Sequence, residues 1–222
     1  MRKVAIVPRW AWFDDIWYRL ATAFWECFFR LYAPVRSYGT ENVPLEGGLL
    51  LVSNHLSYLD PFVWSTTCPR RLKFMTKQEC FINPFVAFFF YAYGGIPLDR
   101  EHPDSTAARA ALTILRQGKA LGLAPEGTRS PDGNLQAFVP TFAKLATKAR
   151  VPIQPAGIAG TYEVWPRSKF LPRPGRIAIV YGEPFDTSAY HGCRVDQELQ
   201  IELSEMIRQR VLDLLARATS EI

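Results

Sequence analysis

Four polar side chains that could carry out chemistry follow directly after an apolar run near residue 50. The run "GGLLLVS", residues 47–53, is typical of a buried strand. The next seven residues hold an amide, an imidazole, a hydroxyl and a carboxylate, from Asn54, His55, Ser57 and Asp60. An imidazole whose ring is held by a carboxylate can remove a proton from a hydroxyl group. The residue types and their spacing therefore predict a general base at His55 with Asp60 as its partner.

Pro61 determines how His55 and Asp60 could meet. Side chains five positions apart on one α-helix point about 140° away from each other, so the two cannot cooperate inside a helix. Proline is favoured at the first helical position and disfavours a helical conformation in the residue before it. We therefore expect a loop at 54–59 and a helix that begins at residue 61. Asp60 would be its N-cap, with helix N–H groups holding the carboxylate.

The nucleophile of a complete catalytic triad has no candidate in this sequence. No G-x-S-x-G motif occurs, and no cysteine lies in a recognisable activating context. A His–Asp pair without its own serine indicates a base that activates a hydroxyl of the substrate. The alternative is that Asp60 only caps a helix and that His55 is an ordinary polar loop residue.

A second polar stretch, "GLAPEGTRSPDG" at 122–133, could bind an anion. It contains, in order, Pro125, Glu126, Gly127, Thr128, Arg129 and Ser130. Backbone N–H groups around Gly127, the threonine hydroxyl and the guanidinium could together hold a phosphate. The alternative is a plain polar turn. Another short strand, in "GGIPLDR" at 94–100, is followed by Asp99 and Arg100, which would bring a second guanidinium to the same edge.

Apolar runs and helical periods alternate along the rest of the 222 residues, which is the order of an α/β sheet. Strands are expected at 48–53, 72–76, 95–98, 119–124, 152–158 and 176–182. Helices are expected at 61–67, 84–93, 104–117, 140–149 and 195–217. The predicted fold is a single α/β domain, residues 36–222, with a mixed, largely parallel sheet flanked by helices. An N-terminal helical arm, residues 1–35, precedes it.

The arm contains a tryptophan-rich segment, residues 10–33, that has the pattern of an amphipathic helix. Most of its polar side chains fall in one narrow sector, namely those of Asp15, Arg19, Thr22, Glu26 and Arg30. Its five charges exclude a membrane-spanning helix. Such a helix lies in a membrane interface or packs into a core, and the tryptophan content favours the membrane surface.

A second apolar stretch, residues 80–98, contains no charge. Pro84 and the Gly94–Gly95 pair interrupt it and leave a helix too short to span a bilayer. We expect a buried helix or part of a hydrophobic wall for an acyl chain.

The net charge of +5 and the pI near 9.1 favour anionic partners. The basic residues are dispersed, so we expect no nucleic-acid partner, and an anionic membrane surface or an acidic carrier fits better. The four cysteines are scattered, without a C-x-x-C pair, which predicts no metal site and reduced thiols that fill apolar space. The N-terminus fails as a secretory signal, so a cytoplasmic location is expected.

Taken together, these stretches resemble the 1-acyl-glycerol-3-phosphate acyltransferases, the lysophosphatidic acid acyltransferase family. The similarity extends from about Arg36 to Phe185. The blocks that match the family in order are "NHLSYLD" at 54–60, "KQE" at 77–79, "GGIPLDR" at 94–100, "PEGTRS" at 125–130 and "VPIQP" at 151–155. The later segments "GTYEVWPR" and "RPGRIAIVYGEPF" also look like the family's.

The resemblance implies direct acyl transfer from acyl-CoA or acyl carrier protein to a lysophospholipid hydroxyl. The acceptor it implies is 1-acyl-glycerol-3-phosphate, which would give phosphatidic acid. It makes His55 the base and Asp60 its orienting partner, with Asn54 and Ser57 in the same motif. The acceptor site would contain Arg100, Glu126, Gly127, Thr128 and Arg129. No cofactor or metal is expected. The enzyme would act at the cytoplasmic face of a membrane, as a peripheral or monotopic protein.

Three positions depart from the family pattern. Ala124 stands where Phe usually precedes the Pro-Glu-Gly-Thr-Arg run, and Val139 and Thr141 replace the Lys and Gly of an F-K-x-G segment. Loss of that lysine removes one contact for an anionic head group. Three alternatives therefore stay open: another lysolipid or a non-phosphate acceptor, a thioester hydrolase in which His55 activates water, and a non-catalytic lipid-binding protein.

Overall fold

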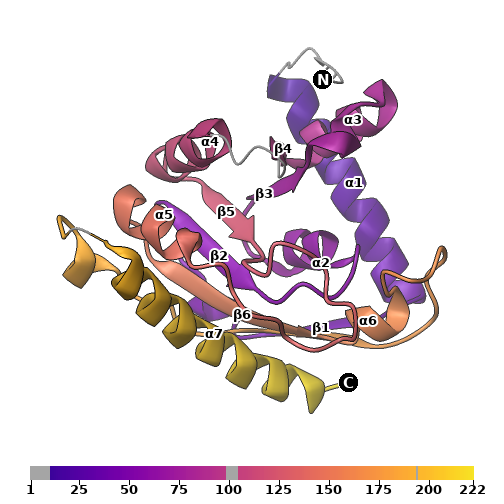
Figure 1. Cartoon of the computed structure of the whole chain (residues 1–222). Coiled ribbons are helices and arrows are strands. Elements are labelled where there is room, and N and C mark those ends of the chain that lie inside the picture. Colours follow the sequence, from indigo (N-terminus) through magenta and orange to yellow (C-terminus); the bar gives the residue numbers. More distant parts are fainter. Residues whose placement is uncertain (1–10, 99–104, 194) are drawn as a thin grey trace.

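A seven-stranded sheet runs through the part of the chain that the computed structural model describes, residues 11–98, 105–193 and 195–222 (Figure 1). Its strands are β1 (Val35–Tyr38), β2 (Leu49–Ser53), β3 (Leu72–Lys77), β4 (Gly95–Leu98), β5 (Ala120–Leu123), β6 (Ile153–Ala159) and β7 (Ile177–Tyr181). They lie side by side in the order β1-β7-β6-β2-β5-β3-β4. Neighbouring strands are parallel, apart from the antiparallel pair β6 and β7. The predicted mixed, largely parallel sheet is confirmed.

Helices cover both faces of this sheet. They are α1 (Ala11–Leu31), α2 (Asp60–Thr67), α3 (Pro84–Tyr93), α4 (Ser105–Arg116), α5 (Thr141–Ala149), α6 (Thr161–Val164) and α7 (Gln197–Thr219). Short 3₁₀ turns occur at η1 (Thr40–Asn42), η2 (Gln78–Phe81) and η3 (Ser188–Tyr190). Helices α1, α2 and α3 pack together on one face, and α4, α5 and α7 cover the other (Figure 1).

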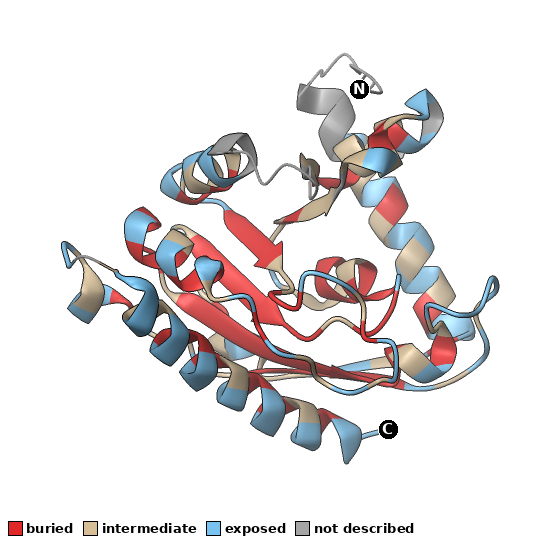
Figure 2. Ribbon diagram, viewed as in Figure 1, coloured by how far each residue is buried: buried red, intermediate tan, exposed pale blue. Residues whose placement is uncertain are grey.

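The core has two apolar layers because successive residues of a strand point to opposite faces of the sheet. In β2, Leu49 and Leu51 pack in the layer of α1–α3, whereas Leu50 and Val52 pack in the layer of α4, α5 and α7. All residues of β2 are buried, and Figure 2 shows the central strands as buried between helices with exposed outer faces. Burial on both faces explains the uninterrupted apolar run in the sequence.

Helix α7 can cross β6 closely because a glycine lies at the crossing. A Cβ atom at Gly157 would collide with the main chain of Leu214 and Leu215. A side chain there would push α7 off the sheet. The apolar layer of Ile207 and Val211 would then open.

The fold class predicted from the sequence is confirmed, and each expected helix and strand is present within a few residues of its predicted range. Strand β1 and helix α6 were not predicted. Each has four residues, too few to produce a recognisable periodic pattern.

Helix α1 uses its apolar surface in two ways. One side packs on the domain: Trp25 stacks on Phe62 with ring centroids 4.0 Å apart, and Tyr18 contacts Tyr93. The other side carries a row of exposed apolar residues, the α1 stripe, formed by Ile16, Leu20, Phe24 and Leu31. The alternative of a helix that packs into the core is therefore right for one face of α1, and the other face is exposed. None of the helices in the described ranges is long and apolar enough to cross a bilayer.

The cysteines Cys27, Cys68, Cys80 and Cys193 are all free thiols, as predicted. The expectation that all four fill apolar space is wrong for two of them. Cys27 lies on the outward side of α1 and Cys193 in the segment before α7, and both are exposed. Within the described residues, no three His, Cys, Asp or Glu side chains are grouped so that they could hold a metal ion.

Candidate active site

The loop between β2 and α2 brings His55 and Asp60 into contact. Nδ1 of His55 lies 2.8 Å from Oδ2 of Asp60. The Asp60 side chain is fully buried, whereas that of His55 is 18% exposed. A carboxylate at Nδ1 keeps the proton on that nitrogen and leaves Nε2 as the acceptor. The pair therefore has the geometry of a base that can receive a proton at Nε2.

The hydrogen bonds of the Asp60 carboxylate go to the loop and to α6. Oδ2 also accepts the N–H groups of Leu56 at 2.7 Å and Ser57 at 2.9 Å, and Oδ1 accepts the Thr161 hydroxyl at 2.7 Å. The prediction that Asp60 caps a helix starting one residue later is wrong. Leu59 has helical backbone angles and is the N-cap residue, so α2 begins at Asp60. The carboxylate turns back over the loop because the loop's own N–H groups point at it.

Hydrogen bonds from Asn54 and Ser57 hold this loop to β6 and to Trp165, the residue after α6. The Asn54 amide donates to the carbonyl of Ile158 and accepts its N–H, both at 2.8 Å. These bonds extend the β2–β6 ladder by one residue beyond its last pair. The Ser57 hydroxyl donates to the carbonyl of Trp165 at 2.7 Å. Both side chains are buried, and their geometry is that of groups that position the loop.

Glu126 joins the His55 loop to the segment that follows β5. One carboxylate oxygen accepts the main-chain N–H of His55 at 2.6 Å, and the other accepts that of Gln136 at 3.0 Å. The main-chain carbonyl of His55 accepts the N–H of Ser130 at 2.8 Å. Glu126 is only 8% exposed. Burial raises the pKa of its carboxyl to about 7, although the N–H groups of Gln136 and His55 act in the opposite direction.

The raised pKa of Glu126 predicts a pH dependence of stability. Between the ordinary pKa of 4.5 and the folded-state value of about 7, the folded chain binds more protons than the unfolded chain. The free energy of unfolding therefore falls as the pH rises through this window. In Glu126→Gln this titration is absent, so the stability of the variant relative to wild type should rise by roughly 3 kcal/mol between about pH 4.5 and pH 8. Denaturant unfolding at both pH values measures this, and parallel pH curves would contradict it.

An apolar cavity of about 410 Å³ lies beside His55. Its apolar walls include Trp25 from α1, Phe62 from α2, Phe74 and Met75 from β3, and Phe90 from α3. Cys80 and Phe90 come from the uncharged stretch at 80–98, which agrees with the expected hydrophobic wall. The cavity can thus hold an apolar chain next to the imidazole.

Arg129 brings a positive charge to this cavity. Its Cζ lies 3.4 Å from the centroid of the Tyr58 ring, a cation–π contact. Its Nη1 is buried and has no hydrogen-bond partner among the described residues. Because a buried donor without a partner is unfavourable, an anion that accepts from it would be stabilised.

The other expected acceptor-site residues are Thr128, Gly127 and Arg100. Thr128 lines the cavity and is exposed. Gly127 has a φ of 71°, which favours glycine, and its N–H donates to the carbonyl of Ala124 at 3.2 Å. This N–H is therefore already used within the turn. Arg100 lies outside the described residues.

Sequence reasoning missed Thr161, Trp165 and the role of Trp25 at this site. Thr161 and Trp165 belong to a segment that was noted only as similar to the family. A usable signal was present, because Thr161 follows the buried strand β6, and loops after parallel strands meet at one edge of the sheet. Trp25 gave no such signal, since it comes from the arm.

This chain is similar in sequence and in structure to known proteins. The family model described as Acyltransferase matches residues 34–159. A 1-acyl-sn-glycerol-3-phosphate acyltransferase of Bacillus subtilis is 26% identical over 182 residues, which is 81% of this chain and 87% of that protein. One from Limnanthes douglasii is 28% identical over 171 residues, 76% of this chain and 60% of its own. The crystal structure of the 1-acyl-sn-glycerophosphate (LPA) acyltransferase PlsC from Thermotoga maritima superposes with a TM-score of 0.74, at 28% identity, covering 90% of this chain and 80% of that one.

Proposed function

The chain belongs to the Acyltransferase family, and we propose that it moves an acyl group from acyl-CoA or acyl carrier protein to the hydroxyl of 1-acyl-glycerol-3-phosphate. The product would be phosphatidic acid. The acceptor is the compound for which the Bacillus and Limnanthes relatives are named. The observation that carries the mechanism is the 2.8 Å contact between His55 Nδ1 and Asp60 Oδ2 beside an apolar cavity.

In the proposed reaction, His55 acts as the general base. Its Nε2 takes the proton of the acceptor hydroxyl while the hydroxyl oxygen bonds to the carbonyl carbon of the thioester. Asp60 orients the ring and stabilises the imidazolium that forms. The tetrahedral intermediate then breaks its carbon–sulfur bond, and the proton on Nε2 passes to the departing thiolate. The products are the new ester and a free thiol, and the imidazole is neutral again.

We propose that Arg129 binds the phosphate of the acceptor, with Thr128 and Arg167 beside it in the cavity wall. The support is the buried Nη1 of Arg129, which has no partner in the described structure. Val139 and Thr141, which replace the family's Lys and Gly, are both exposed, Val139 just before α5 and Thr141 as its first residue. The proposed phosphate contact therefore depends on the arginines.

Arg129→Lys should lower kcat/KM for the phosphate-bearing acceptor about 10- to 100-fold, because an ammonium cannot reproduce the two-pronged contact of a guanidinium. The KM of the acyl donor should change little. Steady-state kinetics with 1-acyl-glycerol-3-phosphate and with a neutral monoacylglycerol measure the effect. Arg217→Lys, an exposed change in the last turn of α7, is the matched control. An equal loss with both acceptors would exclude the phosphate role.

The function itself is tested by a product assay. Labelled acyl-CoA and acyl carrier protein are each offered with phosphate-bearing, zwitterionic and neutral lysolipids, and the products are identified by mass. Acyl release without an acceptor would favour a thioester hydrolase, and lipid binding without turnover would favour a binding protein. The apolar lining of the cavity supports transfer, because it disfavours water beside the thioester.

We further propose that the reaction needs no metal or cofactor and that the enzyme acts at the cytoplasmic face of a membrane. Residues 1–35 would be a membrane-associating arm on an acyltransferase domain at 36–222. The α1 stripe supports this, because an exposed apolar helix face suits a bilayer interface. Deletion of the arm is a poor test, however. Trp25 stacks on Phe62 and lines the cavity, so deletion would also open the active site.

A further inference from the structure

The segment between α6 and β7, residues 165–176, holds two large apolar side chains out into solvent. Phe170 is 91% exposed and Leu171 is 68% exposed. The segment is a closed loop, because the N–H of Arg173 donates to the carbonyl of Val164 at 2.7 Å. Trp165 Nε1 also donates to the carbonyl of Lys169 at 3.1 Å. An apolar pair held outward by internal bonds indicates a surface that meets an apolar partner.

Basic residues surround this apolar pair. Between residues 166 and 176 the sequence contains no Asp or Glu and four basic residues, Arg167, Lys169, Arg173 and Arg176. All four are exposed. An apolar tip with a basic surround complements a bilayer that carries anionic head groups, since the tip can enter the acyl region while the cations contact phosphates.

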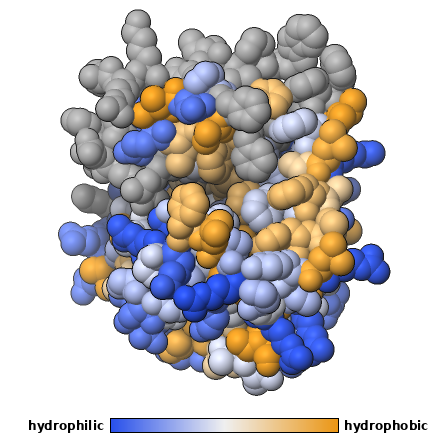
Figure 3. All heavy atoms as spheres, turned by 90° about the vertical axis from the view of Figure 1, so that its right-hand side faces the viewer, coloured by the Kyte–Doolittle hydropathy of each residue, from blue (hydrophilic) through white to orange (hydrophobic). Residues whose placement is uncertain are grey.

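The loop also continues the α1 stripe. The Tyr32 hydroxyl, just after α1, donates to the carbonyl of Pro172 at 3.1 Å, across 140 positions of sequence. Leu31, at the end of the stripe, is 79% exposed. Helix α1 and this loop lie on the same side of the molecule in Figure 1. Figure 3, which views that side, shows hydrophobic side chains gathered over part of it with hydrophilic ones around them.

We propose that the 165–176 loop is a second lipid-contacting element, which inserts Phe170 and Leu171 into an anionic bilayer while its basic residues contact the head groups. The proposal rests on the proposed function, which places the acceptor in a membrane. A single helix lying on a bilayer leaves the molecule free to roll about the helix axis, whereas a second contact fixes its orientation. Trp165 and Arg167, in the same loop, line the cavity, so this orientation sets the cavity beside the lipid.

Sedimentation with vesicles of phosphatidylcholine and phosphatidylglycerol tests the loop directly. The double variant Phe170→Ser/Leu171→Ser should bind on the order of 10- to 100-fold more weakly than wild type, because two apolar side chains no longer leave water. Ile201→Ser is the matched control, since Ile201 is 51% exposed on α7, and it should bind like wild type. Added salt should weaken the vesicle binding of Lys169→Gln/Arg173→Gln less than that of wild type, because fewer charge contacts are left to screen. Unchanged melting temperatures show that the variants are folded.

Vesicle binding of Phe170→Ser/Leu171→Ser equal to that of wild type would overturn the proposal. Unchanged vesicle binding together with a raised KM for acyl carrier protein would overturn it in favour of a docking site for that acidic protein. Sedimentation requires no turnover. A protein that binds vesicles through this loop but transfers no acyl group would therefore contradict the proposed function and leave the loop's role supported.

Discussion

Replacement of His55 by alanine is expected to lower kcat by about 10²- to 10⁴-fold while the chain stays folded. The change removes Nε2, the proposed proton acceptor. It leaves the main-chain bonds of residue 55 to Glu126 and Ser130 in place, because alanine has the same N–H and C=O groups. The loop should therefore keep its path. Measurement of kcat at saturating donor and acceptor, with thermal unfolding beside it, separates lost chemistry from lost structure.

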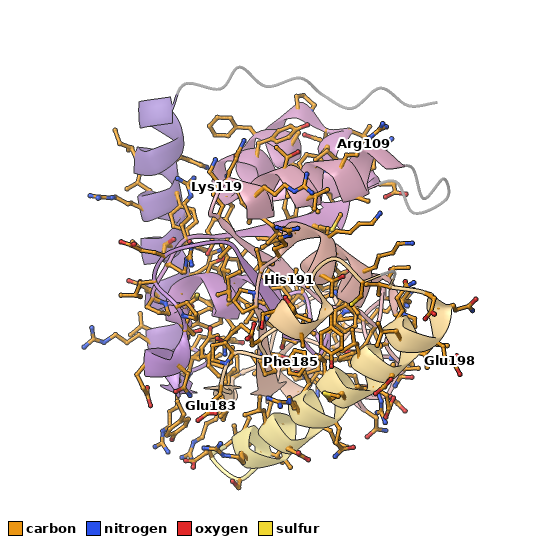
Figure 4. All side chains as sticks on the ribbon, turned by 90° about the vertical axis from the view of Figure 1, so that its left-hand side faces the viewer. Arg109, Lys119, Glu183, Phe185, His191 and Glu198 are labelled. Carbon is orange, nitrogen blue, oxygen red and sulfur yellow. The ribbon has the colours of Figure 1, made fainter. Side chains whose placement is uncertain are left out.

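His191→Ala is the matched control for this experiment. His191 follows η3, on the side of the molecule that Figure 4 shows, and its Nε2 lies 3.0 Å from the Thr187 hydroxyl. Its loss should leave kcat near the wild-type value. A His55→Ala enzyme that also retained near wild-type kcat would end the proposed mechanism.

Asp60→Asn should reduce kcat by about 10²- to 10⁴-fold, up to the whole contribution of a general base. The asparagine oxygen can take the place of Oδ2, facing His55 and the loop N–H groups, while its NH₂ group faces Thr161. The Thr161 hydroxyl can rotate and accept from that NH₂ group. The ring is then still held, but the negative charge that stabilises the imidazolium is gone. The expected loss lies in the chemical step, with a small change in stability.

Variants of Thr161 test whether its hydroxyl accepts the NH₂ group of the asparagine in Asp60→Asn. Thr161→Val in the Asp60→Asn background leaves the buried NH₂ group without its acceptor, which should cost about 1–3 kcal/mol of unfolding free energy. Thr161→Ser keeps the hydroxyl and should restore the stability. Denaturant unfolding measures both variants. If Asp60→Asn alone retained kcat within about tenfold of wild type, the charge of Asp60 would not be needed.

The local part of the site could be predicted from the sequence, and the part built from distant segments could not. His55 and Asp60 lie five positions apart, so a loop was enough to infer their contact. Glu126 accepts the His55 N–H across 71 positions of sequence. The sequence shows only that a carboxylate follows a strand, and it does not indicate that the partner of this carboxylate is a main-chain N–H. The resemblance to the family placed Glu126 in the acceptor site, whereas its carboxylate accepts main-chain N–H groups of His55 and Gln136.

Two other features, the N-cap of α2 and the side of α1 that is buried, could not be predicted for similar physical reasons. Capping preference pointed to Asp60 as an N-cap, but the N–H groups of Leu56 and Ser57 compete for the same carboxylate, and they hold it. The periodicity of α1 showed that it is apolar around most of its circumference. It could not show which side Phe62 and Tyr93 would cover, because that depends on helices placed by the sheet.

The His55 loop is tied down largely by residues that are synthesised long after it. Asn54, His55, Ser57 and Asp60 are bonded to partners from 71 to 108 positions further along the chain. A ribosome adds about 5–20 residues per second, so the base stays unsupported for several seconds after His55 has been translated. A nascent or prematurely terminated chain that ends before Thr161 would carry the whole His–Asp motif but no ordered base. Under the proposed mechanism, the growing polypeptide would not act on thioesters until the segment from Ile158 to Trp165 has been synthesised and bonded to this loop.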